Sequence, residues 1–392
     1  MRRILLALIL IPALQLASIR SANGFAYAGD ASQSTSKKKS CCTLARLVPQ
    51  PEIAKNTDPQ LAEHVTRAFN YLAGNDYMNV FVEGRQAVKD FPQSALAHYL
   101  LGAGLMVLSD FAEATGEFKH CIELDAAFTD AHFMLAQAYR LSAHYDEALA
   151  EYSFVLKERP KFAQVQALIG ECYRAQDHLN AAESKCNDAL KIEPNLPLAY
   201  TILGYTLTLQ NRTEASLMAF QKALELAPDD AYVHFRYGQS LATLRKFTEA
   251  EVQLRKAIEL DPRYADAMLV LSWVLSAQDR MGDAIKYAKT AAALSPTDVD
   301  AHNNLAVLYK KQGNHDQAVV ELKKSRTLKP RSRAIQRSLA MELSKTENID
   351  EAIVELSIAL QQFPLDEELK LALNALLQLK MKKRGAELDQ TQ

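Results

Sequence analysis

Proline residues recur along most of this chain at a fixed interval. They stand at Pro92, Pro160, Pro194, Pro228, Pro262, Pro296, Pro330 and Pro364. Successive positions differ by 34, except for Pro92 and Pro160, which lie twice as far apart and have Ala126 at their midpoint. The stretch Glu123–Ala126 matches Glu259–Pro262 in all but its last residue, so a unit without the proline lies there. Nine units of this one length therefore tile residues 61–366 without insertion or deletion, which indicates stacked structural repeats.

Several positions of these units hold only small residues when the units are aligned from residue 61. The eighth position holds Ala68, Gly102, Ala136, Gly170, Gly204, Gly238, Ser272, Ala306 and Ala340. The twentieth position is alanine or serine in every unit but the first. Each unit has two stretches of about 12 to 14 residues with helical apolar periodicity, joined by a short polar turn. We expect the small residues to let the two helices approach, while large residues at positions 7, 11 and 24 fill the remaining space.

Two units carry a more specific motif. Tyr200–Gly204 followed by Ala219–Pro228 is a close match to it, and so is Ala301–Tyr309. These stretches closely resemble the tetratricopeptide repeat, whose signature is Trp-x2-Leu-Gly-x2-Tyr, then Ala-x3-Phe, then Ala and Pro. The resemblance covers 306 of the 392 residues. It implies an all-α, right-handed superhelical solenoid of nine helix-turn-helix repeats, closed by a C-terminal capping helix.

The repeat boundaries divide most of the chain. Residues 59–366 are predicted to hold the nine repeats, at 61–94, 95–128, 129–162, 163–196, 197–230, 231–264, 265–298, 299–332 and 333–366. Leucines at helical spacing over residues 367–384 predict the capping helix, which would cover the last repeat. Residues 385–392 are expected to be a frayed tail.

The N-terminal residues have the pattern of a secretory signal peptide over residues 1–28. Arg2 and Arg3 precede an apolar run, Ile4–Ile19, and two small-x-small cleavage sites follow it. This predicts export to the periplasm or the secreted space. The alternative is an uncleaved anchor, for which this run with its central proline is short, because a span needs roughly 20 residues.

The residues that follow, 29–58, have a different composition. They are serine-rich and contain Pro49 and Pro51. Such residues are typical of loops, so this stretch is interpreted as a flexible lead-in to the first repeat.

The composition and the motifs argue against several functions. Lys plus Arg number 45 and Asp plus Glu 47, so the formal charge is −2 and a globally basic nucleic-acid binder is disfavoured. Five cysteines are too few for a disulfide-dense scaffold and show no zinc-ligand spacing. No glycine-rich phosphate loop, nucleophile elbow or His-Glu-x-x-His motif occurs. Because the repeats consume nearly the whole chain, the sequence predicts no enzyme, no cofactor and no metal site.

Histidines and cysteines recur at positions that need an interpretation. His64, His98, His132, His234 and His302 all hold the fourth position of their units. Equivalent helices of stacked units lie about 10 Å apart, too far to share a metal whose ligands bind at about 2 Å. We therefore interpret these histidines as packing residues. Cys172 and Cys186 lie on opposite helices of one unit, and whether they pair is left open.

By the resemblance, positions 2, 5, 9 and 12 of each unit face a concave groove. The aromatic residues there are Phe69, Tyr99, Phe133, Tyr205, Tyr232, Phe235 and Trp273. Aromatic side chains bury much area at little entropic cost and are favoured as binding anchors. The alternative is that each packs against a neighbouring helix. We favour binding for the group Tyr205, Tyr232, Phe235 and Trp273, and expect a protein or peptide partner.

Charge is polarised along the chain. Residues 109–156 hold nine acidic and two basic residues. Residues 322–341 hold seven basic residues and no acidic one. We call these seven the basic patch: Lys323, Lys324, Arg326, Lys329, Arg331, Arg333 and Arg337. Such runs are usually solvated faces, but this one is also a candidate partner or membrane-surface site.

These features together predict a non-enzymatic scaffold or adaptor in the cell envelope or the secreted space, with a partner held in the groove. The alternative is a membrane-tethered assembly factor that docks through its basic C-terminal end. Similar exported proteins serve pilus, secretion or polysaccharide-export machinery, which is an analogy only.

Overall fold

The computed structural model describes residues 48–51, 53–54, 57–346 and 348–390. The predicted signal peptide, Cys41, Cys42 and most of the lead-in lie outside the described residues. The chain separates into two units, residues 1–267 and residues 268–392.

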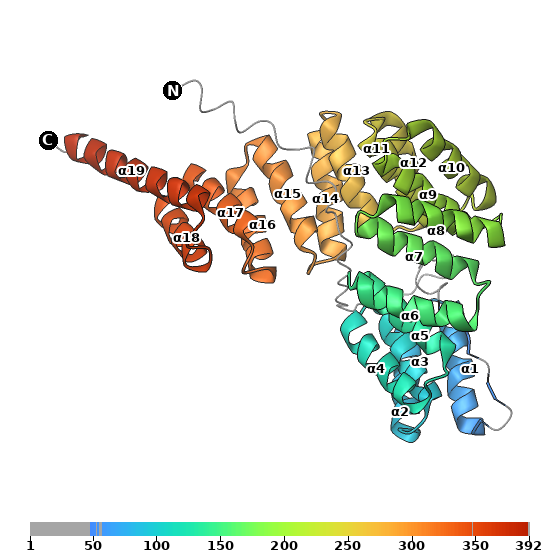
Figure 1. The fold of residues 1–392 in the computed structure, drawn as a ribbon. Helices are drawn as coiled ribbons and strands as arrows, with labels where there is room; N and C mark the ends of the chain where they lie inside the picture. Colours follow the sequence, from blue (N-terminus) through green and yellow to red (C-terminus); the bar gives the residue numbers. More distant parts are fainter. Residues whose placement is uncertain (1–47, 52, 55–56, 347, 391–392) are drawn as a thin grey trace. The chain divides into compact units, whose positions relative to one another are not determined.

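Nineteen α-helices make up the regular secondary structure of the described residues (Figure 1). The first unit contains α1 (Pro59–Ala73), α2 (Tyr77–Asp90), α3 (Ala95–Val107), α4 (Phe111–Leu124), α5 (Thr129–Leu141), α6 (Tyr145–Glu158), α7 (Ala163–Ala175), α8 (Leu179–Ile192), α9 (Pro197–Leu209), α10 (Thr213–Leu226), α11 (Ala231–Thr243) and α12 (Phe247–Leu260). The second contains α14 (Met281–Leu294), α15 (Val299–Gln312), α16 (His315–Leu328), α17 (Arg333–Lys345), α18 (Ile349–Gln362) and α19 (Glu367–Gln390). The boundary falls within α13 (Ala265–Ala277).

The helices pack in adjacent pairs, one pair to each 34-residue repeat, which confirms the predicted all-α repeat fold. Beyond the ninth pair, α19 provides the predicted capping helix, and Leu369 is buried in the core of the last repeat. This helix continues to Gln390, past the predicted end at residue 384.

The turn inside each repeat uses a left-handed residue at position 15. Asn75, Ser109, Ala143, Asp177, Asn211, Arg245 and Asp279 all have φ between 59° and 64°, and Gly313 has φ 80°. The following amide closes the turn by donating to a carbonyl five residues back, as Asp110 does to Leu105 at 2.9 Å. Seven of these eight turns therefore hold a strained conformation without a glycine.

The small eighth residue makes room for the large residue at position 24, as the sequence predicts. A Cβ atom on Gly204 would lie 2.8 Å from the Phe220 ring, and one on Gly102 would lie 2.6 Å from the Phe118 ring. Gly84 departs from the pattern because its Cβ would lie 2.6 Å from the Cα of Leu101, so here two backbones touch.

The fourth-position histidines link the two helices of their repeats. His98, His132 and His302 each bring Nδ1 within 2.6 to 2.7 Å of a glutamate carboxylate 19 residues later. In each case Nε2 lies 3.0 to 3.2 Å from a backbone carbonyl oxygen six residues earlier. Hydrogen bonds thus hold these side chains inside the repeat framework. No group of three metal-ligating side chains occurs among the described residues.

Three described cysteines are free. Cys121, Cys172 and Cys186 are all buried, so the possible disulfide between Cys172 and Cys186 is not formed.

Within the described ranges, every helix is too short or too polar to cross a bilayer.

Candidate peptide-binding groove

First helices of four successive repeats bring charged and aromatic side chains together in the first unit. We call this group the arginine cluster: Arg140 on α5, Glu171 and Arg174 on α7, Tyr205 on α9, and Tyr232 and Arg236 on α11. Figure 1 shows the four helices succeeding one another within the unit. Residues up to 96 positions apart in the sequence therefore contribute to one surface.

Glu171 is the centre of the cluster. Arg174 donates to both of its carboxylate oxygens, at 2.8 and 3.0 Å. Arg236 donates from Nη2 to Oε1 at 2.9 Å, which joins α7 to α11. The Glu171 side chain is 6% exposed, whereas those of Arg174 and Arg236 are 13% and 17% exposed. The two arginines are thus closer to solvent than the carboxylate that they share.

Aromatic rings fix the two guanidinium groups. The Tyr205 ring centroid lies 4.7 Å from Cζ of Arg174 and 5.2 Å from Cζ of Arg236. The Tyr232 and Phe235 rings lie 5.1 and 5.6 Å from Cζ of Arg236. Cations over aromatic faces at these distances are attracted to the ring quadrupole. Three of the four aromatic residues favoured for binding therefore surround Arg236.

The cluster carries a positive excess. Burial by itself would raise the pKa of Glu171, but Arg174 and Arg236 outweigh it and hold the pKa of this carboxyl far below its ordinary value. Arg140 donates to the neutral Gln137 side chain at 2.9 and 3.0 Å instead of to a carboxylate. Three arginines and one carboxylate leave two positive charges. Because none of these groups exchanges a proton near neutral pH, the cluster suits binding and not acid–base chemistry.

Two buried donors of this region have no hydrogen-bond partner among the residues that the structure describes. They are Nε of Arg236 and Nε2 of Gln137. Gln137 is 1% exposed, so its amide is removed from bulk water. Unsatisfied buried donors cost free energy and need an explanation, and an acceptor supplied by a ligand is one that fits their charge.

The predicted aromatic residues at position 5 pack inside their own repeats. Tyr99, Phe133 and Phe235 are buried at position 5, where each ring lies against the aromatic residue at position 34 of its own repeat. The ring centroids are 5.1 Å apart for Tyr99 and Phe128 and 5.6 Å apart for Phe133 and Phe162. The remaining two, Phe69 on α1 and Trp273 on α13, are partly exposed.

Part of the lead-in covers Tyr99. The hydroxyl of Tyr99 donates to the carbonyl oxygen of Pro49 at 2.5 Å, and Val48 and Pro51 are buried. Ile53 also packs against the core of the first unit. This end of the groove is therefore occupied by the chain itself, although the sequence pattern favours a flexible lead-in here.

The basic patch is largely paired with carboxylates in the second unit. Five of its seven residues have an acidic partner: the pairs are Lys323–Glu351, Lys324–Glu321, Arg326–Glu355, Arg333–Asp366 and Arg337–Glu368. Lys329 and Arg331 are exposed. Because five of its seven charges form ion pairs, the patch offers less positive charge to a partner than its sequence indicates.

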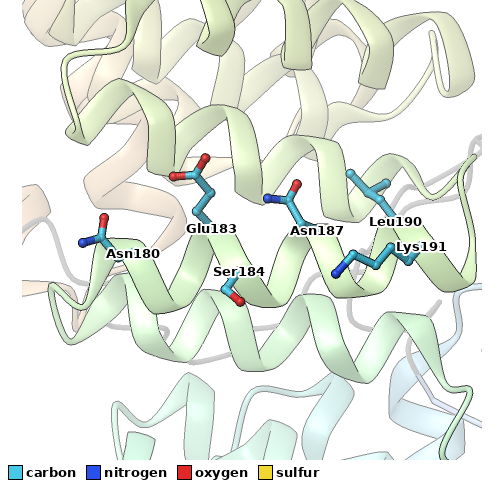
Figure 2. A pocket seen from close by; sticks show the side chains of 6 residues that line it. All are labelled: Asn180, Glu183, Ser184, Asn187, Leu190 and Lys191. Atoms are coloured by element: carbon cyan, nitrogen blue, oxygen red, sulfur yellow. The ribbon is translucent and has the colours of Figure 1, made fainter.

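An open hollow of about 660 Å³ lies along α8 (Figure 2). Its lining residues all come from that one helix: Asn180, Glu183, Ser184, Asn187, Leu190 and Lys191. Glu183 already accepts two hydrogen bonds from Arg212, at 2.7 and 2.8 Å. The hollow lacks a convergent set of charged groups from several elements, so it is a weaker candidate than the arginine cluster.

Sequence reasoning did not single out Arg140, Glu171 or Arg174. All three lie at position 9 or 12, which the resemblance already assigns to the groove, but only aromatic residues were selected there. Charged residues at those positions in neighbouring repeats were the available signal.

Profiles of the tetratricopeptide repeat match residues 100–172, 203–265, 235–299 and 275–342. The chain belongs to the tetratricopeptide repeat family. Tetratricopeptide repeat proteins are protein-interaction scaffolds, and the family is generally non-enzymatic. No curated protein matches this tetratricopeptide repeat chain.

Comparison with solved structures finds matches at low sequence identity. A chain of the APC/C hetero-tetramer Cut9–Hcn1 is 15% identical with a TM-score of 0.55, covering 81% of this chain and 62% of that one. PilW, a type IV pilus biogenesis factor, is 23% identical with a TM-score of 0.48. The match covers 54% of this chain and 98% of PilW. PilF from Pseudomonas aeruginosa is 17% identical with a TM-score of 0.47. The match covers 56% of this chain and 98% of PilF. At these identities the similarity concerns the fold alone.

Proposed function

We propose that this protein is a non-enzymatic scaffold that captures an extended segment of a partner protein in the groove of its first unit. The observation that carries the proposal is the arginine cluster. Helices α5, α7, α9 and α11 bring the three arginines and the one carboxylate of the cluster to one surface. Arg174 and Arg236 remain partly exposed there.

The chemistry of the cluster indicates an acidic segment. A guanidinium presents planar, paired donors that match a carboxylate, and here tyrosine rings hold two such groups in place. A preorganised donor set loses little entropy when a ligand binds. The excess of two positive charges favours a partner segment with carboxylates over a neutral or basic one.

Export is a second part of the proposal. Arg2, Arg3 and the apolar run that follows support it, and the scaffold would then act in the periplasm or the secreted space. N-terminal sequencing of the mature protein tests this part: a start at Phe25 or Gly29, directly after one of the two predicted cleavage sites, is expected. A start at Met1 would favour the tethered alternative.

A pull-down from an extract of the producing cell tests the groove. The baits are the full chain, Arg174→Gln, and Lys222→Gln as the matched control on the exposed side of α10. We expect a partner that the wild type and the control both retain and that Arg174→Gln loses, after circular dichroism has shown equal helicity. Equal retention by all three baits would move the binding surface away from the arginine cluster.

A further inference from the structure

A second hollow, of about 630 Å³, lies in the second unit between α14 and α16. Three buried residues of α15 contribute to its lining: His302, Leu305 and Tyr309, each between 3% and 5% exposed. Ala292 and Ala293 line it from α14. An adjoining hollow of about 420 Å³ shares Lys289 and Tyr309 with it, so the concavity extends further along α14.

A small side chain lines this hollow at a position where most repeats hold a large one. Position 28 of the repeat is valine, isoleucine or leucine in seven of the nine units: Val88, Ile122, Leu156, Leu190, Leu224, Ile258 and Leu360. Where these side chains are partly buried, as at Ile122 and Leu190, they pack against the core. In the seventh repeat the position holds Ala292, which lines the hollow. The space that an aliphatic side chain fills elsewhere is thus left open to a ligand.

Charge at the rim of the hollow is predominantly positive. Lys289 is exposed, and its ammonium lies 5.6 Å from the Tyr309 ring centroid. Lys324 is exposed and donates to Glu321 at 2.9 Å. The carboxylate of Glu321 is buried and also lies 2.6 Å from Nδ1 of His302. Two lysines against one buried carboxylate leave a positive rim around an apolar floor.

We propose that this hollow binds a partner segment in which a leucine-sized aliphatic side chain stands next to a carboxylate. The aliphatic group takes the place of the side chain missing at Ala292 and covers Leu305 and Tyr309. The carboxylate pairs with Lys289 at the rim. This site is separate from the groove of the first unit and does not depend on what that groove binds.

NMR spectroscopy of labelled methyl groups in the full chain tests the proposal. Alanine methyls labelled with carbon-13 report on the hollow through Ala292 and Ala293, assigned with Ala292→Leu and Ala293→Ser. The probe is the peptide acetyl-Ala-Leu-Glu-Ala-amide. We expect it to shift both resonances, with about two- to fivefold weaker binding when glutamine replaces the glutamate. Replacing its leucine by alanine should weaken binding about tenfold or more. Wild-type resonances that do not move would overturn the proposal.

Three variants make the test specific. Ala292→Leu restores the common residue at position 28, so it should melt at the same or a higher temperature and lose the probe. Lys289→Gln should bind the glutamate and glutamine peptides equally. Lys286→Gln, on the same helix but outside the lining, should still discriminate between them. Undiminished binding to Ala292→Leu, or discrimination retained by Lys289→Gln, would contradict the assignment.

Discussion

Arg236 reaches back across 65 residues of sequence to place Nη2 at 2.9 Å from Oε1 of Glu171. The two residues belong to first helices two repeats apart, α11 and α7. In a solenoid most contacts join neighbouring repeats, so this ion pair is a direct link between two repeats that are not neighbours. It also fixes the spacing of the arginines that we propose to bind the partner.

Acid should weaken this pair. The pKa of Glu171 is lowered in the fold, so its contribution to stability is fully present above the unfolded value of about 4.3 and is lost as pH falls through the folded value. We expect Glu171→Gln to cost about 3–5 kcal/mol at pH 7, because two partly buried arginines lose their charged partner. Urea melts followed by circular dichroism should show the difference from wild type narrowing below about pH 4. Parallel curves at all pH values would contradict this account.

A methyl group at Gly204 should disrupt the pairing of α9 with α10. Its Cβ would meet the Phe220 ring at 2.8 Å, so Gly204→Ala should destabilise the first unit by about 1–3 kcal/mol through overpacking. Gly116→Ala on α4 is the control, because nothing lies within 4 Å of its Cβ. That variant should gain up to about 1 kcal/mol of helix propensity. Equal effects of the two substitutions in urea melts would exclude close packing as the cause.

Relief of strain in a turn should stabilise the protein. Ala143 has φ 62°, a conformation that costs a residue with a Cβ about 1–2 kcal/mol. Ala143→Gly is therefore expected to raise stability by about 1 kcal/mol after the greater entropy of the unfolded glycine is subtracted. Ala112→Gly, at an exposed site inside α4, should lower it by a similar amount. Thermal melts that shift in the same direction for both would refute the assignment of strain.

The buried thiols should resist alkylation. Burial raises the pKa of Cys121 and of Cys172 to about 12, and it also raises the pKa of Cys186. In a chain carrying Cys41→Ser and Cys42→Ser, iodoacetamide at pH 8 should label the folded protein at least tenfold more slowly than the denatured protein, since only the thiolate reacts. Rapid labelling of the native chain would show that these sites open locally.

The periodic features of the fold could be predicted because they recur from repeat to repeat. The small residue at position 8 recurs in all nine units and its large partner at position 24 in six, and Gly204 with Phe220 has the expected geometry. A short polar turn inside each repeat was predicted, but the left-handed conformation at position 15 was not, because the residue there is glycine only at Gly313. Propensity carries no such signal when asparagine, serine and even alanine hold that conformation.

The candidate site was predicted less well than the fold. Position 5 was assigned to the groove, but the position-34 aromatics lie over it, so Phe133 stacks on Phe162. Which of two aromatic residues faces solvent depends on side-chain packing, and the 34-residue period does not determine it. The arginine cluster was missed because Arg140 and Arg174 resemble ordinary surface charges until α5, α7 and α11 are placed together.

The contact between Tyr99 and Pro49 means that the folded first unit starts upstream of its first repeat. A recombinant fragment trimmed to residue 59, where the predicted repeat region begins, would lack the buried Val48 and Pro51 and would remove the acceptor of the Tyr99 hydroxyl. Such a fragment would expose to solvent the surface around Tyr99 that residues 48–51 cover in the intact chain. Binding partners isolated with it would include ligands of that artificial surface, so screens for the natural partner need a chain that retains residues 48–54.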